Sequence, residues 1–591
     1  MNENNSLALV IFGKDLPKKT LNWWKQFNVV FAPSELESEV RGRGVAFIPI
    51  DDFIEPGSIY EASAFAEELS CLTLPDGSRL TKTFLYKGYE LWWVHYNSIF
   101  LYFCLPYTQH RKLLEYLKQI QSVSFYRPPY KSLFSCYLRA YGCEVAILRE
   151  RGFKSPSSFP FGVLFQILIT FFSILILSVH KRRIMVFTGD KFEKDKDYDF
   201  RMKYIYEELR QRKLPFVEFI RSLESWKTVL GHAIKRKRPV IYSEGITFVG
   251  RFVSVILGGH RRGRKKFGVH NFSSETDPEK KFKLLVATQY LLGVYDDIWA
   301  IRIMKLILQV IGVKAALVIT ASERNFHAVL GCKLNDTPTV GIQHGVASPH
   351  YNVTDFMPGF DEEKMLSVDK YGLWSEWWKE YYVKNSKAYR PEQLYVSGPM
   401  RPLMRGGVLL DRNQKRDDLI RVLFVSEQQA VPEEVLPYLN ALMEKEGVLV
   451  YITFRSYRDN FEIWLKNNHP EILHKFGEDK ILRRGIQDAI SYCDVVIGSH
   501  STGVLEALLA LKPIVFFSTK KYGDYFDLKD HGSRYKFFAE NPKDLMDCIM
   551  KSKKIPTDAL KGLQERFFGD PYRSGSKWVV EQVENILQKT P

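Results

Sequence analysis

Residues 493–517 read CDVVIGSHSTGVLEALLALKPIVFF and contain two apolar runs separated by a helical stretch. The order strand, helix, strand predicts a right-handed βαβ unit in a parallel sheet. Two further apolar runs precede it, IRVLFVS at 420–426 and GVLVYITF at 447–454. Together these runs predict a doubly wound α/β domain in this part of the chain.

A second series of the same kind lies upstream. Its expected strands lie in RRIMVFTGD (182–190), LPFVEFI (214–220), AALVIT (315–320) and TPTVGIQHG (337–345). Gly, Pro and charged residues interrupt the pattern at 397–418, which indicates a junction between domains. The fold prediction is α/β with two tandem Rossmann-like domains and an additional N-terminal α/β region.

The chain of 591 residues is long enough for several domains, and we divide it into five segments. They are an N-terminal accessory α/β region (1–150), an apolar helix with a basic flank (151–182), an N-terminal Rossmann-like domain on the acceptor side (183–400), a C-terminal Rossmann-like nucleotide-donor domain (415–570) and a C-terminal crossing helix (571–591).

The net charge of +16 is compatible with nucleic acid, an anionic membrane face or phosphorylated substrates as partners. The sequence contains no zinc finger, RNA-binding aromatic signature or basic leucine-zipper region, so we expect no nucleic acid. Seven cysteines without a CxxC pair are typical of reduced thiols. With no signal-peptide pattern at the N-terminus, we expect a cytoplasmic protein.

Residues 159–179 form a charge-free run long enough to cross a bilayer, followed at once by HKRR at 180–183. Two more basic clusters follow, KRKR at 235–238 and HRRGRKK at 260–266. The run is either a spanning helix or a helix buried in protein or dipped into the membrane face, and we favour the second. We therefore expect a peripheral protein at the cytoplasmic face of an anionic membrane.

Polar residues follow one strand in each domain, where ligands of doubly wound sheets bind. Gln343, His344 and Gly345 follow the strand in TPTVGIQHG. In the second domain a helix is expected from about Ser501, whose N-terminus is suited to an anion. Thr502 and Glu506 are four residues apart and share a helix face, so a phosphate there would lie beside a carboxylate. A histidine held in a turn and a helix cap without ligand are the structural alternatives.

Three stretches carry a resemblance to a known family: TPTVGIQHGV (337–346), YGLWSEWWKEYYVKNSKAYRPEQLYVSGPM (371–400) and 493–517. In order and spacing they resemble GT-B-type glycosyltransferases of bacterial and archaeal surface-polysaccharide synthesis. These include capsule polysaccharide transferases, polysialyltransferases and CDP-glycerol glycerophosphotransferases. The resemblance covers 310–585 well, 183–310 loosely and 1–150 hardly at all.

The resemblance implies a GT-B fold whose cleft binds a nucleotide-activated donor on the C-terminal domain. His344 would deprotonate the acceptor hydroxyl or donate to the leaving phosphate, with Gln343 beside it. The remaining implied donor-binding residues are Ser501, Thr502 and Gly503 for phosphate, Glu506 for ribose, and His500. Because a helix N-terminus and arginines can stabilise the leaving phosphate, we expect no metal and no cofactor besides the nucleotide-sugar.

One departure from the family pattern concerns the strand at 447–454. The CDP-glycerol transferases and polysialyltransferases usually carry a His-Pro pair just after it, whereas this chain reads RSYRD at 455–459. Arg455 and Arg458 are expected to supply positive charge for the donor phosphate instead. The change leaves general sugar transfer ahead of sialyl or glycerophosphate transfer.

The sequence therefore predicts a metal-independent glycosyltransferase that moves a sugar from a nucleotide-activated donor to a lipid-linked or growing surface polysaccharide. The alternatives are a CDP-alcohol phosphotransferase or nucleotide-sugar 2-epimerase of the same fold. From another class, the chain could be a non-catalytic subunit of a glycan-assembly complex. Possession of both His344 and the 501–506 motif favours an enzyme, because a scaffold needs neither.

Overall fold

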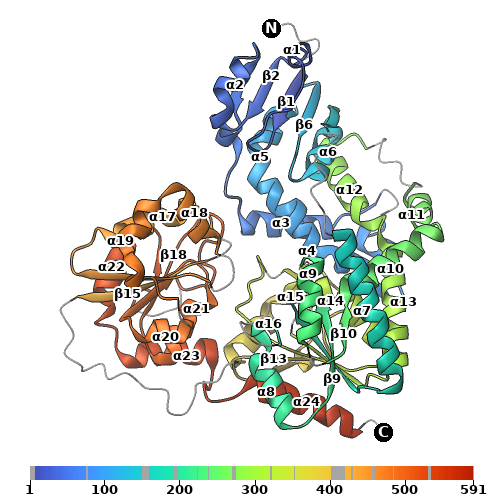
Figure 1. Cartoon of the computed structure of the whole chain (residues 1–591), viewed down its shortest axis with the longest axis vertical. Coiled ribbons are helices and arrows are strands. Elements are labelled where there is room, and N and C mark those ends of the chain that lie inside the picture. Colours follow the sequence, from blue (N-terminus) through green and yellow to red (C-terminus); the bar gives the residue numbers. More distant parts are fainter. Residues whose placement is uncertain are drawn as a thin grey trace.

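The structure, a computed structural model, describes most of the chain and contains three parallel sheets, each in its own part of the sequence (Figure 1). The described residues are 7–589 without 75–76, 149–158, 191–196, 223, 237, 269–274, 320–322, 352, 401–418, 428–429, 456–458, 484 and 530–533.

The N-terminal domain, blue in Figure 1, is built on a sheet of order β3-β2-β1-β6-β7. Its strands are β1 (Leu7–Ile11), β2 (Val29–Ala32), β3 (Ala46–Pro49), β6 (Ser122–Tyr126) and β7 (Glu144–Leu148), and a hairpin pairs β4 (Leu85–Tyr86) with β5 (Tyr89–Glu90). Its helices are α1 (Leu21–Trp24), α2 (Glu37–Arg41), α3 (Ile59–Ser70), α4 (Tyr96–Ile99), α5 (Leu105–Leu117) and α6 (Lys131–Ala140).

The middle domain carries a sheet of order β10-β9-β8-β11-β12-β13-β14, parallel throughout. Its strands are β8 (Ile184–Gly189), β9 (Phe216–Arg221), β10 (Val240–Tyr242), β11 (Ala315–Val318), β12 (Thr339–Ile342), β13 (Lys370–Leu373) and β14 (Leu394–Val396). Its helices are α7 (Phe159–Val179), α8 (Lys203–Gln211), α9 (Trp226–Lys235), α10 (Ser243–Ile256), α11 (Gly259–Gly268), α12 (Pro278–Leu291), α13 (Val294–Ile311), α14 (Glu323–Lys333), α15 (Val353–Phe356) and α16 (Glu376–Asn385).

The C-terminal domain, orange in Figure 1, has a parallel sheet of order β16-β15-β17-β18-β19. Its strands are β15 (Ile420–Val425), β16 (Val448–Thr453), β17 (Val495–Gly498), β18 (Ile514–Phe517) and β19 (Phe538–Ala539). The helices of this part of the chain are α17 (Pro432–Met443), α18 (Asn460–Asn468), α19 (Pro470–Lys480), α20 (Ile486–Ser491), α21 (Thr502–Leu505), α22 (Pro542–Ser552), α23 (Thr557–Phe568) and α24 (Gly575–Lys589).

The predicted fold class is confirmed by these sheets. A strand occurs in every apolar run for which one was predicted. Strands β8 and β17, which lie inside their sheets, are almost fully buried, as parallel strands covered on both faces must be. The junction predicted at 397–418 falls mostly on 401–418, outside the described residues.

Helix α24 lies against the middle sheet although it follows the C-terminal domain in sequence (Figure 1). Its Val579, Val580 and Val583 are buried in one apolar cluster with residues of α8, β8, β11 and β12. At its N-terminal end the indole of Trp578 covers Gly372 of β13, where an added Cβ would lie 2.6 Å from the ring. The chain thus returns from the C-terminal domain to complete the middle domain.

Helix α7 packs against β10, the edge strand of the middle sheet. The backbone N–H of Tyr242 donates to Thr170 Oγ1 over 2.9 Å, and that of Val240 donates to Ser173 Oγ over 3.2 Å. Gln166 Nε2 donates to the Ser222 carbonyl over 3.0 Å. The first two hydrogen bonds satisfy donors that the edge strand leaves open, and the third satisfies a carbonyl after β9, so α7 is an integral part of this domain.

A buried guanidinium links three neighbouring strands of the middle sheet. Arg236, just before β10, lies 2.6 Å from Glu218 of β9 and 2.6 Å from Asp190, which follows β8. The side chains of Arg236 and Glu218 are fully buried and that of Asp190 is 2% exposed. Arg238 Nε also lies 3.1 Å from Glu218 Oε1, and His232 Nδ1 lies 3.0 Å from Asp190 Oδ1. Removing Arg236 would still deprive two buried carboxylates of their closest cation, which is a costly change in a dry interior.

We expect Arg236→Met to lower the free energy of unfolding by about 3–5 kcal/mol, the usual cost of breaking a buried ion pair on one side. Arg210→Met is the matched control, because Arg210 pairs with Asp197 over 3.3 Å while 53% exposed. Its expected cost is below about 1 kcal/mol. Urea unfolding of both variants measures the difference, and equal small losses would contradict the assignment.

Candidate active site

The structure brings together the two loops that the sequence analysis selected. The backbone N–H of Val346, after β12, lies 3.5 Å from Thr502 Oγ1, after β17. A Cβ on Gly345 would lie 3.4 Å from the same hydroxyl, an ordinary van der Waals contact, so Gly345 also lies next to Thr502. The carboxyl ends of one strand from each tandem domain therefore meet at this point, and the half-buried His344 stands beside it.

Gln343, for which a catalytic position was predicted, is buried and hydrogen-bonded within the middle domain. Only 1% of the surface of Gln343 is exposed to solvent. The side-chain carbonyl accepts a hydrogen bond from the Trp374 backbone N–H over 3.1 Å, and the Trp374 indole N–H donates to the Gln343 carbonyl over 2.8 Å. Gln343 therefore ties the loop after β12 to the loop after β13, which positions His344.

The helix predicted from about Ser501 is only partly α-helical in the structure. Only Thr502–Leu505 are α-helical, and Glu506–Ala510 continue as a 3₁₀ turn. Ser501 Oγ accepts a hydrogen bond from the Gly503 N–H over 3.1 Å and so acts as the N-cap. Because so short a helix has a weak dipole, the hydroxyl of Thr502 and nearby charged side chains matter more here than the helix N-terminus.

The residues after β16 are described in part. Arg455 is exposed, and its backbone N–H donates to Asp459 Oδ2 over 3.0 Å. Asp459 also accepts from Ser426 Oγ over 2.9 Å, which ties the ends of β15 and β16 together. Arg458 lies outside the described residues. His469 lies where α18 ends and α19 begins, with Nδ1 3.2 Å from Glu471 Oε1.

A pair of groups that the sequence analysis did not combine lies beside Thr502. His500 Nε2 is 3.8 Å from Glu427 Oε2, each side chain being 10% exposed. His500 Nδ1 lies 2.8 Å from Ser499 Oγ, and the imidazole stacks on the ring of Tyr522 at 3.7 Å. These contacts hold the imidazole so that Nε2 points toward the carboxyl group.

Burial makes both members of this pair neutral near pH 7. It raises the pKa of Glu427 to about 8 and lowers the pKa of His500 to about 3, the latter aided by the positive charges of Lys521 and Arg455. Glu427 Oε1 is buried and has no hydrogen-bond partner among the described residues. A protonated carboxyl there can donate to an anionic oxygen or bond a hydroxyl of a ligand.

Lys521 adds a cation to this group. It is half-buried, and burial lowers its pKa from the ordinary lysine value, against the opposing effect of Glu434. The neighbouring Lys520 is exposed, so Lys521 is the better placed of the two lysines. Glu427 directly follows the strand run IRVLFVS, so the rule that selected His344 and Ser501 would have selected it too.

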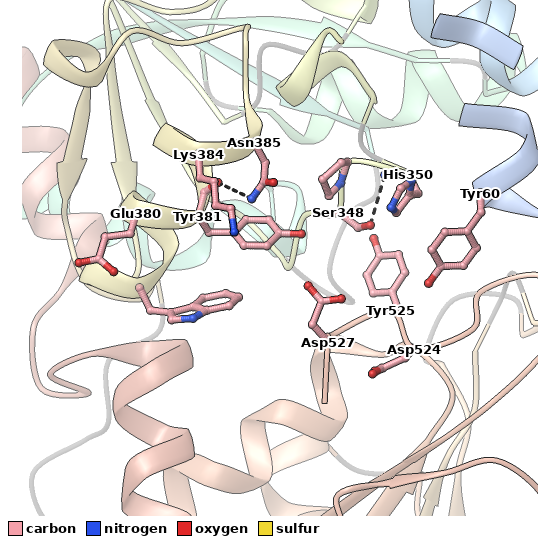
Figure 2. A pocket seen from close by; sticks show the side chains of 12 residues that line it. Tyr60, Ser348, His350, Glu380, Tyr381, Lys384, Asn385, Asp524, Tyr525 and Asp527 are labelled. Carbon is pink, nitrogen blue, oxygen red and sulfur yellow. Dashed lines mark hydrogen bonds between the residues drawn. The ribbon is translucent and has the colours of Figure 1, made fainter. Parts of the chain in front are cut away.

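A pocket of about 440 Å³ opens next to this group, where all three domains meet (Figure 2). Tyr60 comes from the N-terminal domain and Tyr525 from the C-terminal domain, and Ser348 belongs to the loop after β12. The other lining residues are Pro349, His350, Trp377, Glu380, Tyr381, Lys384, Asn385, Asp524 and Asp527. Aromatic faces beside carboxylate and amide groups suit a ligand that has both apolar faces and hydroxyls.

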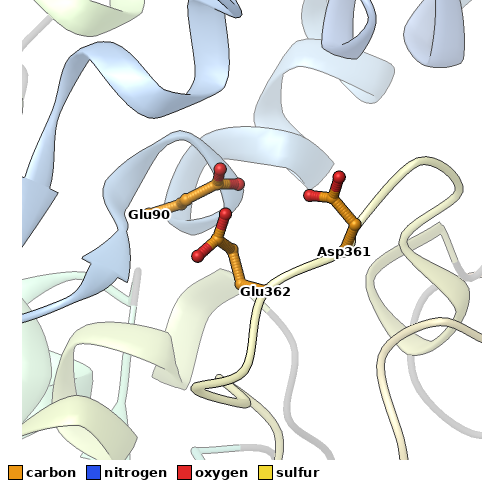
Figure 3. A group of neighbouring side chains, drawn as sticks. All are labelled: Glu90, Asp361 and Glu362. Carbon is orange, nitrogen blue, oxygen red and sulfur yellow. The ribbon is translucent and has the colours of Figure 1, made fainter.

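Another cluster of acidic side chains lies where the N-terminal domain contacts the middle domain. Carboxylate oxygens of Glu90, Asp361 and Glu362 lie within 4.8 Å of one another (Figure 3). Lys82 Nζ lies 3.0 Å from Glu362 Oε1, and Arg79 Nη1 lies 2.9 Å from Asp361 Oδ2. These ion pairs join the N-terminal domain to the middle domain, so we assign the cluster to that interface.

No protein-family model matches this chain, and no curated protein matches it in sequence. Among solved structures, the S. aureus MnaA-UDP co-structure is 12% identical, with 69% of this chain and 97% of that chain covered and a TM-score of 0.40. HepE of Anabaena in complex with UDP and glucose is 13% identical, with coverages of 69% and 100% and a TM-score of 0.37. A glycosyltransferase from Rickettsia africae is 12% identical, with coverages of 69% and 100% and a TM-score of 0.36. Because these TM-scores are low, the likenesses carry no argument about function, which depends on the geometry of this chain.

Glu427→Gln tests the protonation of the buried pair. The raised pKa means that folding favours the protonated acid, so this contribution to stability is complete below about pH 4 and is lost as the pH rises through about 8. Glutamine mimics the protonated acid at all pH values. The stability of the wild type relative to Glu427→Gln should therefore fall by up to about 1.4 kcal/mol per pH unit across this window.

Urea unfolding of both proteins at several pH values measures this difference. Glu433→Gln serves as the control, because Glu433 is exposed on the neighbouring helix α17. A stability difference for Glu427→Gln that does not change with pH would show that the carboxyl ionises normally.

Proposed function

We propose that this chain is a glycosyltransferase that moves a sugar from a nucleotide-activated donor to a hydroxyl of a glycan acceptor, lipid-linked or growing. The observation that carries the proposal is the meeting of two strand ends, where Val346 N–H lies 3.5 Å from Thr502 Oγ1. Polar residues of the middle domain there face those of the C-terminal domain, so two substrates bound on opposite sides would be in reach of one another.

The C-terminal side of this junction suits the donor. Lys521 and Arg455 supply positive charge that can neutralise the nucleotide phosphate as it leaves, the role that a metal ion would otherwise serve. Thr502 Oγ1 and the buried acid Glu427 provide hydrogen bonds, and Glu506 lies one helical turn further on. Because burial raises the pKa of Glu427 to about 8, this carboxyl adds no negative charge near pH 7, so the site remains favourable for an anion.

The opposite side suits the acceptor. The junction pocket is lined by Trp377, Tyr381 and Tyr60, which offer ring faces for a sugar, and by carboxylate and amide groups that can bond its hydroxyls. His344 lies in the same loop as Ser348 of this pocket. In the proposed step, His344 takes the acceptor proton, the acceptor oxygen bonds to the anomeric carbon, and the bond from that carbon to the nucleotide phosphate breaks.

The reaction type is tested by incubating the protein with a panel of nucleotide-sugars and CDP-alcohols, with and without glycan acceptors. Acceptor-dependent release of the nucleotide supports sugar transfer. Formation of a 2-epimer without acceptor, or release of CMP from a CDP-alcohol, would replace it with one of the two related reactions. In the productive assay, His344→Ala should lower turnover by roughly 10²- to 10⁴-fold and change donor affinity by no more than a few fold.

His469→Ala is the matched control for this variant, because His469 lies between α18 and α19 and should leave turnover unchanged. Near-normal turnover of His344→Ala would remove this histidine from catalysis. A loss of donor affinity equal to the loss of turnover would instead make it a phosphate ligand.

Two variants of Thr502 test whether its hydroxyl binds the donor phosphate or only contacts the middle domain. Thr502→Val keeps the shape of the side chain but loses the hydroxyl, and a lost hydrogen bond to a charged phosphate should weaken nucleotide binding by roughly 10- to 150-fold. Thr502→Ser keeps the hydroxyl and should bind within a few fold of the wild type. Calorimetric titration with nucleoside diphosphates measures both variants, and equal affinities would place the donor phosphate elsewhere.

A further inference from the structure

Helix α7 turns an apolar stripe to solvent. Its exposed large side chains recur at helical spacing along one face, and they are Leu164, Leu168, Phe171, Phe172, Leu175, Ile176 and Val179. Their exposed fractions run from 44% at Leu168 to 77% at Val179. The 18-residue segment Gly162–Val179 has a mean hydropathy of 2.4, yet only 33% of it is buried.

The neighbouring helix α10 has a similar stripe. Phe248, Phe252, Val255 and Ile256 are exposed on it, by 65% in the case of Ile256. The two helices are in contact, since a Cβ on Gly245 of α10 would lie 3.4 Å from Ile167 Cγ1 of α7. Exposed apolar surface on two adjoining helices is unusual for a protein surface that faces only water.

Basic side chains border both stripes. His180 and Lys181 follow α7 directly and are exposed. Helix α11 follows α10, and its Arg261, Arg262, Arg264 and Lys265 are also exposed. Apolar side chains flanked by cations match a bilayer surface that carries anionic headgroups, because the cations meet the headgroups while the apolar side chains enter the region below them.

The hydrogen bonds of α7 decide how it would meet a bilayer. Thr170 and Ser173 accept from two backbone N–H groups of β10, and a helix withdrawn to cross the membrane would leave these donors without partners. Each lost bond to a buried donor carries a desolvation cost. Contact through the exposed face requires no such loss, so α7 can lie along the membrane while it remains packed on the sheet.

We propose that the stripes of α7 and α10, with the basic residues that border them, form a docking surface for an anionic lipid bilayer, on which α7 lies in the plane of the membrane. This inference uses no residue of the candidate active site and is independent of the proposed reaction. Membrane docking here depends on two interactions: insertion of apolar side chains into the bilayer, and attraction between basic side chains and anionic headgroups.

Vesicle co-sedimentation of the full chain tests the proposal. Vesicles of phosphatidylcholine mixed with phosphatidylglycerol are compared with vesicles of phosphatidylcholine alone, at low and high salt. We expect binding to the anionic vesicles, weaker binding to the neutral ones, and weakening by salt, because surface charges are screened. Arg261→Ala with Arg264→Ala should reduce anionic binding about fivefold for each charge removed.

The apolar contribution is tested by Phe172→Glu with Ile176→Glu, which should reduce binding to the anionic vesicles by at least about tenfold, since each aromatic or aliphatic side chain loses its burial. The matched controls lie on the C-terminal domain. Ile463→Glu with Met550→Glu alters exposed apolar residues, and Lys543→Ala with Lys551→Ala removes exposed charges. The controls should bind vesicles like the wild type, and thermal unfolding verifies that every variant is folded.

Three results would overturn the proposal. The first is absence of vesicle binding by the wild type, or equal binding by the α7 variant and the controls. The second is a wild-type dimer that the α7 variant converts to monomers, measured by light scattering, without vesicle binding; the surface would then bind a second copy of the chain. The third is a wild type that stays in cell membranes through carbonate extraction and leaves them only with detergent, which would establish a spanning helix.

Discussion

Burial of the apolar face of α24 against the middle sheet is the constraint on which the arrangement of the tandem domains depends. Val579, Val580 and Val583 pack on one face of that sheet, and Arg212, which follows α8, forms ion pairs with Glu581 and Glu584. Since α24 follows α23 after only a short turn, the C-terminal domain cannot move far from the middle domain while α24 stays in place. The loops that contain His344 and Thr502 are held opposite each other as a result.

The N-terminal domain reinforces the same junction. The Ile59 N–H donates to the Lys521 carbonyl over 3.1 Å, and the Tyr60 hydroxyl donates to the Tyr522 carbonyl over 3.1 Å. Ser63 Oγ donates to the Pro349 carbonyl over 3.4 Å in the middle domain. Helix α3 therefore contacts the segment that contains Lys521 and the loop that contains Ser348, so the N-terminal domain helps to fix the geometry of the candidate site.

The sequence was sufficient to predict the α/β class, the strands of the tandem domains and the two loops that meet, because buried parallel strands have a strong apolar pattern and place their following residues at one edge. It was insufficient for Gln343, whose burial depends on Trp374 at the end of a different strand. Glu427 was accessible to the same rule, but its unusual protonation depends on burial by distant residues. The contribution of Tyr60 has no signature in the sequence, since α3 reaches the site through tertiary packing alone.

The position of α24 also sets an order of events during synthesis. The ribosome completes the middle sheet well before it synthesises residues 575–589. The face of β8, β11 and β12 that α24 covers therefore stays exposed until the C-terminal domain has been made. Apolar surface exposed for that long is where aggregation begins and where chaperones bind. We therefore expect the protein to be most prone to aggregation after its middle domain has been synthesised and before α24 has. Packing of α24 on the sheet ends this stage.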